Sequence, residues 1–439
     1  MMIFTYILFF IISYVFHQYG FFIYSSIFLL LLSIILYVEE VRKSGLIINF
    51  RGILSIGFIG GLGISLLKLS NLASPFELKT WICFFVVYPI FYFAYEIATK
   101  KFIMQNENIL KDLTPDINTL EKKASDKNAI RAFTGLLIIS ICIFSLICFF
   151  IEAYLLKFIP LFTIETPHAY STFHIKGLHY LTITYTLIPS IGVLYYNKQQ
   201  KIDFVVLLSA IYPAVLSLLL VSRSGIILSY ILMFFTFVVQ KSIDKDFLWE
   251  RKNSYYIIKM TFFFVLLIIV IASLYIVVSI YRAHTSEYLI DIFDLKDKNI
   301  PIWIQQPYIY IANNYENFNY LVKNIGNHAF GLKGLYPFFT FSGLKFLFPS
   351  LTQFFLYINK AELTTGTFIY DAYYDFGVLG VIFFSFLIGF LCGKLNNIVK
   401  KTKNIFYYIL YAQISYYLFF SFFACWFSLP QTYFYLIIN

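Results

Sequence analysis

Charged residues are scarce in this chain of 439 residues: they make up 13% of it, whereas hydrophobic residues make up 60%. Soluble globular proteins carry roughly twice that share of charge. The shortage excludes a soluble fold and predicts an all-α polytopic integral membrane protein. Phe and Tyr are plentiful instead, with 53 and 37 residues, and many lie at the ends of apolar runs, where aromatic rings suit the membrane interface.

Cysteine is also scarce, and each of the five cysteines falls inside an apolar run, without any C-x-x-C spacing. Packing inside the membrane is therefore their expected role, rather than disulfide formation or metal ligation.

The D-x-D formed by Asp244 and Asp246 stands in a charged loop without a nucleotide-binding pattern, and we interpret it as solvated charge. We expect no metal, no cofactor and no nucleic-acid partner. The N-terminus lacks a basic n-region and a cleavage site, which predicts that the first apolar run is retained as a helix.

Long apolar runs recur along the chain. A helix rises 1.5 Å per residue, so about 20 apolar residues cross a hydrocarbon core of about 30 Å. The runs predict eleven helices (10 to 12) near residues 2–18, 21–38, 52–68, 81–98, 132–155, 178–196, 204–222, 225–240, 260–281, 376–393 and 405–427.

Basic residues are distributed unevenly between the connections. The even-numbered connections hold 21 Lys and Arg residues, whereas the odd-numbered ones hold 5, leaving aside the long late segment. Cytoplasmic loops carry the excess of basic residues, so the N-terminus is expected in the cytoplasm. We expect membrane helices in 1–281 with a cytoplasmic loop at 99–131, an extracytoplasmic segment at 282–374, with short or re-entrant helices packed on the membrane domain, and final membrane helices in 375–439.

Arg223 is the only charge in the 37 residues from Phe204 to Gln240. One helix of that length would be roughly 55 Å long, so a turn is predicted at Ser222–Gly225, where Ser and Gly supply turn chemistry. The charge pattern puts this turn outside the cytoplasm. Two interpretations stay open: an arginine whose side chain extends to lipid phosphates, and a guanidinium that binds the phosphate or pyrophosphate of a substrate.

The same two interpretations apply to Arg282, which ends the ninth predicted helix and is followed by His284 and Glu287. Basic residues of this chain otherwise favour the cytoplasmic side. Two arginines at outer helix ends therefore favour an anionic, lipid-linked substrate.

Aromatic and amide side chains dominate the segment WIQQPYIYIANNYENFNYLV, residues 303–322. Aromatic faces stack on sugar rings and amides hydrogen-bond to hydroxyls, although anchoring at the membrane interface explains the aromatics as well. A glycine-broken loop, FGLKGLYP, follows at 330–337. The candidate substrate-binding residues in and between the two stretches are Trp303, Tyr308, Tyr315, His328 and Tyr336, with a structural role left open for His328. Asp371 and Tyr374, further along the chain, are candidates of the same kind.

Two carboxylates precede the tenth predicted helix. Asp375 stands at its N-cap position, where a carboxylate accepts backbone hydrogen bonds and faces the positive end of the helix dipole. Capping does not explain Asp371, four residues earlier, or neighbouring aromatic residues such as Tyr374. If the stretch is helical, Asp371 and Asp375 share a face. Two carboxylates without further ligands indicate a metal site only weakly.

Asp375, Phe376 and Gly377, with Gly380 three residues on, form a D-F-G-x-x-G pattern at the start of a late helix. This pattern resembles the O-antigen or oligosaccharide repeat-unit polymerases, the Wzy family. SRSGII at 222–227 resembles the arginine-bearing outer turn of that family, and YIYIANNYENFNYLV its aromatic segment before the last outer loop. The specific resemblance covers about 60–70 residues; the first 200 are similar in hydropathy alone.

The resemblance implies an enzyme at the outer face of the bacterial inner membrane that acts on undecaprenyl-pyrophosphate-linked oligosaccharides. It would transfer the growing glycan from its lipid carrier to the non-reducing end of the next lipid-linked unit. Arg223 and Arg282 would stabilise the lipid pyrophosphate without a metal. The candidates for the base are His284, Glu287, Asp371 and Asp375. A chain-length regulator and a flippase are the protein partners that this activity implies.

Two other functions stay open. A lipid-linked oligosaccharide flippase or another transporter would carry charges near mid-membrane and internal repeats. Lys68, Glu96 and Glu152 lie instead toward the ends of apolar runs, and no repeat is visible. A ligase that moves finished glycan onto a lipid A core would share the membrane architecture, the outer arginine and histidine and the lipid carrier, so the sequence separates it poorly.

Overall fold

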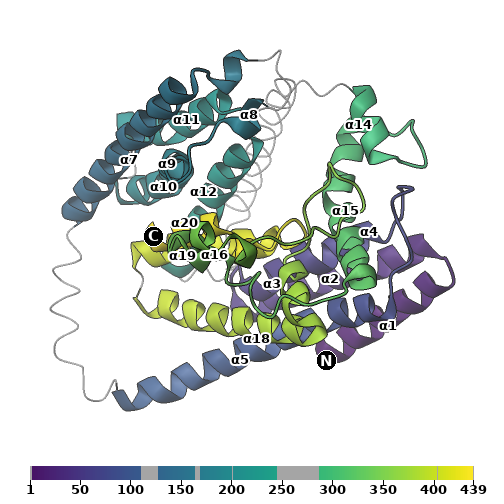
Figure 1. Ribbon diagram of the computed structural model, residues 1–439. Coiled ribbons are helices and arrows are strands. Elements are labelled where there is room, and N and C mark those ends of the chain that lie inside the picture. The colour runs from purple at the N-terminus through teal and green to yellow at the C-terminus, as the bar shows by residue number, and fades with distance from the viewer. Residues whose placement is uncertain are drawn as a thin grey trace. The chain divides into compact units, whose positions relative to one another are not determined.

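The computed structural model describes residues 2–109, 127–163, 169–199, 201–244, 286–402 and 404–438 (Figure 1). These residues are helical or irregular, and the β contact among them is an isolated bridge between Ser70 and Leu295. Five described helices are long and apolar enough to cross a membrane, namely Phe22–Ser44, Leu78–Lys100, Arg131–Leu156, Arg223–Ile243 and Tyr370–Thr402. The prediction of an all-α chain with apolar helices of membrane-crossing length is confirmed over these residues.

The predicted apolar runs coincide with helices wherever the structure describes them. These helices are α1 (Met2–Gln18), α2 (Phe22–Ser44), α3 (Phe50–Leu54), η1 (Ser55–Gly60), α4 (Gly61–Ser65), α5 (Leu78–Ile109), α7 (Lys127–Leu156), α9 (Leu178–Thr182), η3 (Ile183–Leu187), α10 (Ile188–Gln199), α11 (Phe204–Leu219), α12 (Arg223–Asp244), α18 (Tyr370–Thr402) and α19 (Ile405–Phe419). The run at 260–281 lies outside the described residues.

The remaining helices belong to the segment 286–351, to the connection before α9 and to the end of the chain. They are η2 (Pro160–Phe162), α8 (Ala169–Thr172), α14 (Ser286–Phe293), α15 (Ile302–Asn324), α16 (Tyr336–Phe341), α17 (Leu344–Leu347), η4 (Pro349–Leu351), η5 (Trp426–Ser428) and α20 (Pro430–Ile438). The predicted run 405–427 is wrong at its end, because α19 stops at Phe419 and the chain turns before α20.

The chain forms two compact units, of which the first comprises residues 1–102, 286–398 and 417–438. Within it α1 pairs with α2, where the hydroxyls of Ser13 and Ser25 lie 2.8 Å apart. Asn397 near the end of α18 donates to the Thr99 carbonyl of α5 at 3.2 Å.

α15 is the polar centre of this first unit. Its amides are buried because the neighbouring loops satisfy them: Asn317 donates to the carbonyls of Leu363 and Thr365 at 2.7 Å each. Asn319 accepts from the backbone N–H of Glu77 at 2.9 Å. At 23 residues, α15 is longer than the short or re-entrant helices expected in this stretch.

A buried ion pair ties α15 to the loop after α4. The Lys68 ammonium pairs with the Glu316 carboxylate, and both side chains are 3% exposed. Lys68 also donates to the Ser74 carbonyl at 2.9 Å, while the Ser74 N–H donates to the second Glu316 oxygen at 3.0 Å. Burial raises the pKa of Glu316 and lowers the pKa of Lys68, and the charge of each partner opposes the other's shift. Removing one partner of such a pair leaves an uncompensated buried charge, so the pair fixes the loop to the helix.

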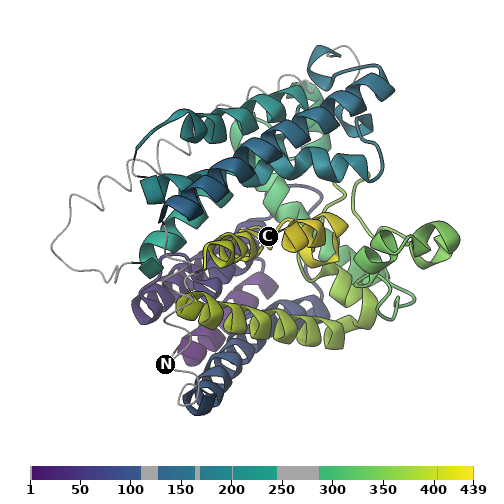
Figure 2. The same cartoon turned by 90° about the vertical axis from the view of Figure 1, so that its left-hand side faces the viewer.

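The second unit comprises residues 103–285 and 399–416. α7, α10, α11 and α12 pack side by side in it, as both Figure 1 and Figure 2 show. The Ser217 hydroxyl of α11 donates to the hydroxyl of Tyr185 in η3 at 2.9 Å. α11 and α12 meet at a turn over residues 220–222, so the predicted break in the 37-residue apolar stretch is confirmed. Its predicted position, Ser222–Gly225, is wrong beyond Ser222, because Arg223, Ser224 and Gly225 are the first residues of α12.

Candidate functional site

The D-F-G-x-x-G segment is a kink inside α18. Phe376 (φ −140°, ψ 20°) and Gly377 (φ 60°, ψ −142°) leave the helical conformation, while the helix itself begins at Tyr370. The φ of Gly377 lies in the region that favours glycine. A Cβ on Gly380 would lie 2.0 Å from the Ala372 carbonyl oxygen, so the chain after the kink approaches the chain before it too closely for a side chain. The two glycines of the motif thus permit the kink.

Backbone carbonyls at the kink accept hydrogen bonds from the loop that precedes α16. The Tyr374 carbonyl accepts from the N–H of Ala329 and the Asp375 carbonyl from the N–H of Phe330, both at 3.1 Å. His328 Nδ1 donates to the same Tyr374 carbonyl at 3.1 Å. In an unbroken helix these carbonyls would accept from N–H groups four residues later. The kink therefore holds the loop through hydrogen bonds that a straight helix does not offer.

The Asp375 side chain completes this attachment. It is 4% exposed, and its two oxygens accept the backbone N–H groups of Lys333 at 3.0 Å and Gly334 at 2.8 Å. The prediction that Asp375 is the N-cap of its own helix is wrong, because its carboxylate accepts the N–H groups of a loop some 40 residues away in the chain.

Lys333 joins the two aspartates. Its ammonium lies 3.3 Å from Asp371 Oδ1, while its backbone N–H donates to Asp375. Aromatic rings surround the ammonium, with centroids at 5.0 Å for Tyr374, 5.3 Å for Phe354 and 5.8 Å for Tyr370. A cation over aromatic faces is stabilised by the ring quadrupoles. The prediction that Asp371 and Asp375 share a face is confirmed, since both contact Lys333.

We call His328, Lys333, Asp371, Tyr374 and Asp375 the kink site. Sequence reasoning named four of them and missed Lys333; its position between two glycines of the loop was the signal that could have indicated it. The kink site offers the ion pair of Lys333 and Asp371 beside the ring of Tyr374, a combination that suits a polar ring-shaped ligand such as a sugar. Among the described residues, no group of three or more His, Cys, Asp or Glu side chains is arranged to hold a metal ion.

The other residues predicted to bind carbohydrate lie outside the kink site. Tyr315 is fully buried and donates to the Phe58 carbonyl at 2.6 Å, and Tyr308 is buried with its hydroxyl accepting the Leu69 N–H at 2.8 Å. Both hydroxyls are thus engaged in hydrogen bonds within the protein interior. Trp303 is 70% exposed at the start of α15, and Tyr336 is half-buried beside the Lys345 ammonium, 5.9 Å from its ring centroid.

Arg223 is the first residue of α12 in the second unit, and it is 7% exposed. An arginine whose side chain extends outward to lipid headgroups would be exposed in the absence of lipid, so this burial favours an internal role. The turn before it is fixed by the Ser222 hydroxyl, which accepts the Gly225 N–H at 3.1 Å. Val221 of the turn packs with Ile226 and Tyr230 against the connection that precedes α9. Arg282 and His284 lie outside the described residues.

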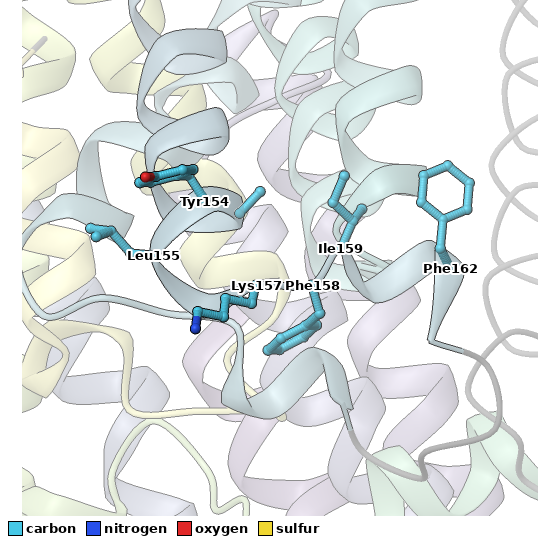
Figure 3. A pocket seen from close by; sticks show the side chains of 7 residues that line it. Tyr154, Leu155, Lys157, Phe158, Ile159 and Phe162 are labelled. Carbon is cyan, nitrogen blue, oxygen red and sulfur yellow. The ribbon is translucent and has the colours of Figure 1, made fainter.

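A pocket of about 670 Å³ opens at the end of α7, also in the second unit (Figure 3). Figure 3 shows its walls, formed by Tyr154 and Leu155 of the helix and by Lys157, Phe158, Ile159 and Phe162 of the connection after it. The lining is mainly apolar, with one ammonium at Lys157, and includes none of the residues predicted from the sequence.

In comparisons with known families, characterised proteins and solved structures, none matches this chain.

Proposed function

We propose that this protein is a repeat-unit polymerase of the bacterial inner membrane, similar in activity to the Wzy family. It would join undecaprenyl-pyrophosphate-linked oligosaccharides into a surface polysaccharide, an O-antigen or a capsule, at the outer face of that membrane. The observation that carries the proposal is the kink site. The D-F-G-x-x-G residues that resemble the family hold a loop with an ammonium, two carboxylates and tyrosines together in one place.

The reaction that we propose is a glycosyl transfer. A hydroxyl at the non-reducing end of one repeat unit attacks the anomeric carbon of the growing glycan, whose bond to the lipid pyrophosphate breaks. The hydroxyl proton passes to a base, and the pyrophosphate leaves as an anion. Positively charged groups placed where that charge develops lower the barrier, and losing one such donor typically costs about 10²–10³ in rate.

Each unit, taken by itself, contains groups suited to one part of this chemistry. In the first unit, the ion pair of Lys333 and Asp371 beneath the ring of Tyr374 suits the hydroxyls and the flat faces of a sugar. Asp375 is a positioning residue for the loop, because both of its oxygens are engaged by backbone N–H groups. In the second unit, Arg223 offers a guanidinium fork for phosphate oxygens, and the buried setting strengthens charge-assisted hydrogen bonds.

The membrane arrangement belongs to the same proposal. We propose eleven spans, a cytoplasmic N-terminus and an extracytoplasmic segment at 282–374, in accordance with the excess of basic residues on the alternate connections. A flippase would deliver the lipid-linked units to the outer face, and a chain-length regulator would act on the product.

Deletion of the gene followed by electrophoresis of the surface glycan tests the activity. The proposal predicts that the ladder of polymer lengths disappears while a single repeat unit stays attached, and that the wild-type gene restores the ladder. Loss of every attached unit would contradict the proposal and indicate the ligase or the flippase.

A further inference from the structure

A second polar cluster, around Glu152, lies in the second unit. Glu152, in the last turns of α7, is fully buried at its side chain. Its carboxylate accepts three different donors: the Ile175 N–H at 3.0 Å, the Thr182 hydroxyl at 2.7 Å and His179 Nδ1 at 3.2 Å from each oxygen. Three donors suit an ionised carboxylate, which can only accept hydrogen bonds.

This arrangement selects one tautomer of the neutral imidazole. Because the Glu152 oxygens accept from His179 Nδ1, the hydrogen of the neutral ring lies on Nδ1 and the lone pair lies on Nε2. The His179 side chain is 32% exposed, whereas the carboxylate behind it is shielded from water. A histidine oriented by a buried carboxylate, with its second nitrogen available, is the arrangement that general bases use.

The element that follows His179 in the chain contacts the helix of Arg223 within the same unit. α9, which carries His179, continues directly into η3, where the Tyr185 hydroxyl reaches the start of α12; a Cβ on Gly225 would lie 2.1 Å from it. Two of the carboxylates that the sequence suggested as bases are engaged elsewhere: Asp371 pairs with Lys333, and Asp375 accepts two backbone N–H groups. The side chain of the third, Glu287, lies outside the described residues.

We infer that His179 is the base of the transfer reaction and that Glu152 is its positioning residue, an inference that rests on the proposed function. In the step, Nε2 accepts the proton of the acceptor hydroxyl as its oxygen bonds to the anomeric carbon. The bond from that carbon to the pyrophosphate breaks with its electron pair, and Glu152 stabilises the imidazolium that results. The proton then passes to water. Among the described residues, the titratable groups that contact the ring are Glu152 on α7 and His174 on the preceding connection, whose ring centroid is 6.5 Å away.

The test measures the initial rate of polymer formation by the full-length protein in membranes, with lipid-linked repeat units as substrate, across pH about 5 to 8. His179→Asn keeps a donor near the position of Nδ1 but cannot take a proton. We expect its rate to fall by about 10² or more and its pH dependence to flatten, because protonation of Nε2 no longer limits the reaction at low pH. Glu152→Gln is expected to lower the rate less. His174→Asn is the matched control, since His174 Nδ1 donates to a backbone carbonyl, of Ser171, and not to a carboxylate.

Two results would overturn the role of His179. One is a His179→Asn variant with the wild-type rate and pH profile. The other, independent of any variant, is a wild-type rate that does not decline as the pH falls through the range in which histidine gains a proton. Wild-type protein that makes no polymer contradicts the proposed function itself, so the two failures are distinguishable.

Discussion

Lys333 is held from two directions at once: its backbone N–H by Asp375 and its ammonium by Asp371. The two aspartates stand four residues apart in the first turns of α18, so the helix itself sets the spacing of the two contacts. The sequence shows this spacing but not its target, because Lys333 lies about 40 residues earlier in a loop without periodicity. The proposed activity of the kink site therefore depends on the positioning of Lys333 by Asp371 and Asp375.

The substitution Asp375→Asn tests the role of the kink site most directly. An asparagine has one side-chain oxygen, so the second backbone N–H would face an amide N–H₂ instead of an acceptor. We expect polymer formation to fall at least about tenfold at an unchanged level of protein, since a lost hydrogen bond to a charged group costs about 1.5–3 kcal/mol. The surface glycan ladder is the measurement.

Asp291→Asn is the control for this prediction, because Asp291 is an exposed aspartate of the same unit. A full ladder from the Asp375→Asn variant would contradict this prediction and show that the Asp375 carboxylate does not influence activity.

Arg223 is expected to be sensitive even to a change that keeps its charge. A guanidinium makes two parallel hydrogen bonds to phosphate oxygens, whereas lysine offers a compact point charge. We expect Arg223→Lys to lose much of the polymerising activity and Arg223→Ala to lose about 10²–10³ in rate, with α11 and α12 still inserted. Arg42→Lys, at an exposed arginine near the end of α2, provides the matched control. A lysine variant that polymerises at the wild-type level would rule out phosphate recognition by the fork.

At the scale of elements, the kink of α18 depends on its glycines. Alanine at Gly377 would place a Cβ in a backbone conformation that costs about 1–3 kcal/mol for other residues, and also 3.3 Å from the His328 ring. Alanine at Gly380 would place a Cβ 2.0 Å from the Ala372 carbonyl. We expect both variants to lower the melting temperature of the purified protein. Gly326→Ala should leave it unchanged, because nothing lies within 4 Å of the added Cβ and the φ there is unexceptional. Equal melting temperatures for all three would contradict the strained kink.

The apolar helices could be predicted because a long run of hydrophobic residues is enough to indicate each of them. α1, for example, has the same first and last residues as its predicted run. α15 was not, since its mixture of amides and aromatic residues is typical of an exposed loop. Its amides are buried because loop backbone from residues 74–77 and 357–365 meets them, and that pairing between distant segments leaves no periodic signal. For the same reason the sequence did not indicate the partner of Asp375 or the orientation of His179 by Glu152. His328 was named separately from Asp371 and Tyr374, and the structure brings the three together at the kink site.

At the scale of the whole molecule, the sidedness can be tested by labelling. The native cysteines Cys83, Cys142, Cys148, Cys392 and Cys425 are buried, so they contribute little background. The positions Ser342 and Lys43 are exposed and belong to the predicted outer segment and to a predicted cytoplasmic connection. In spheroplasts, a membrane-impermeant maleimide should label Ser342→Cys directly and Lys43→Cys only after the membrane is permeabilised. The reverse pattern would place the kink site on the cytoplasmic side and contradict the proposed donor.

The activity itself is tested most directly with the purified protein in vesicles and with undecaprenyl-pyrophosphate-linked repeat units as the only substrate. The account predicts a ladder of glycans on the lipid, with one undecaprenyl pyrophosphate released for each unit added. Repeat units that stay at length one, whether unchanged or moved across the vesicle membrane, would contradict it.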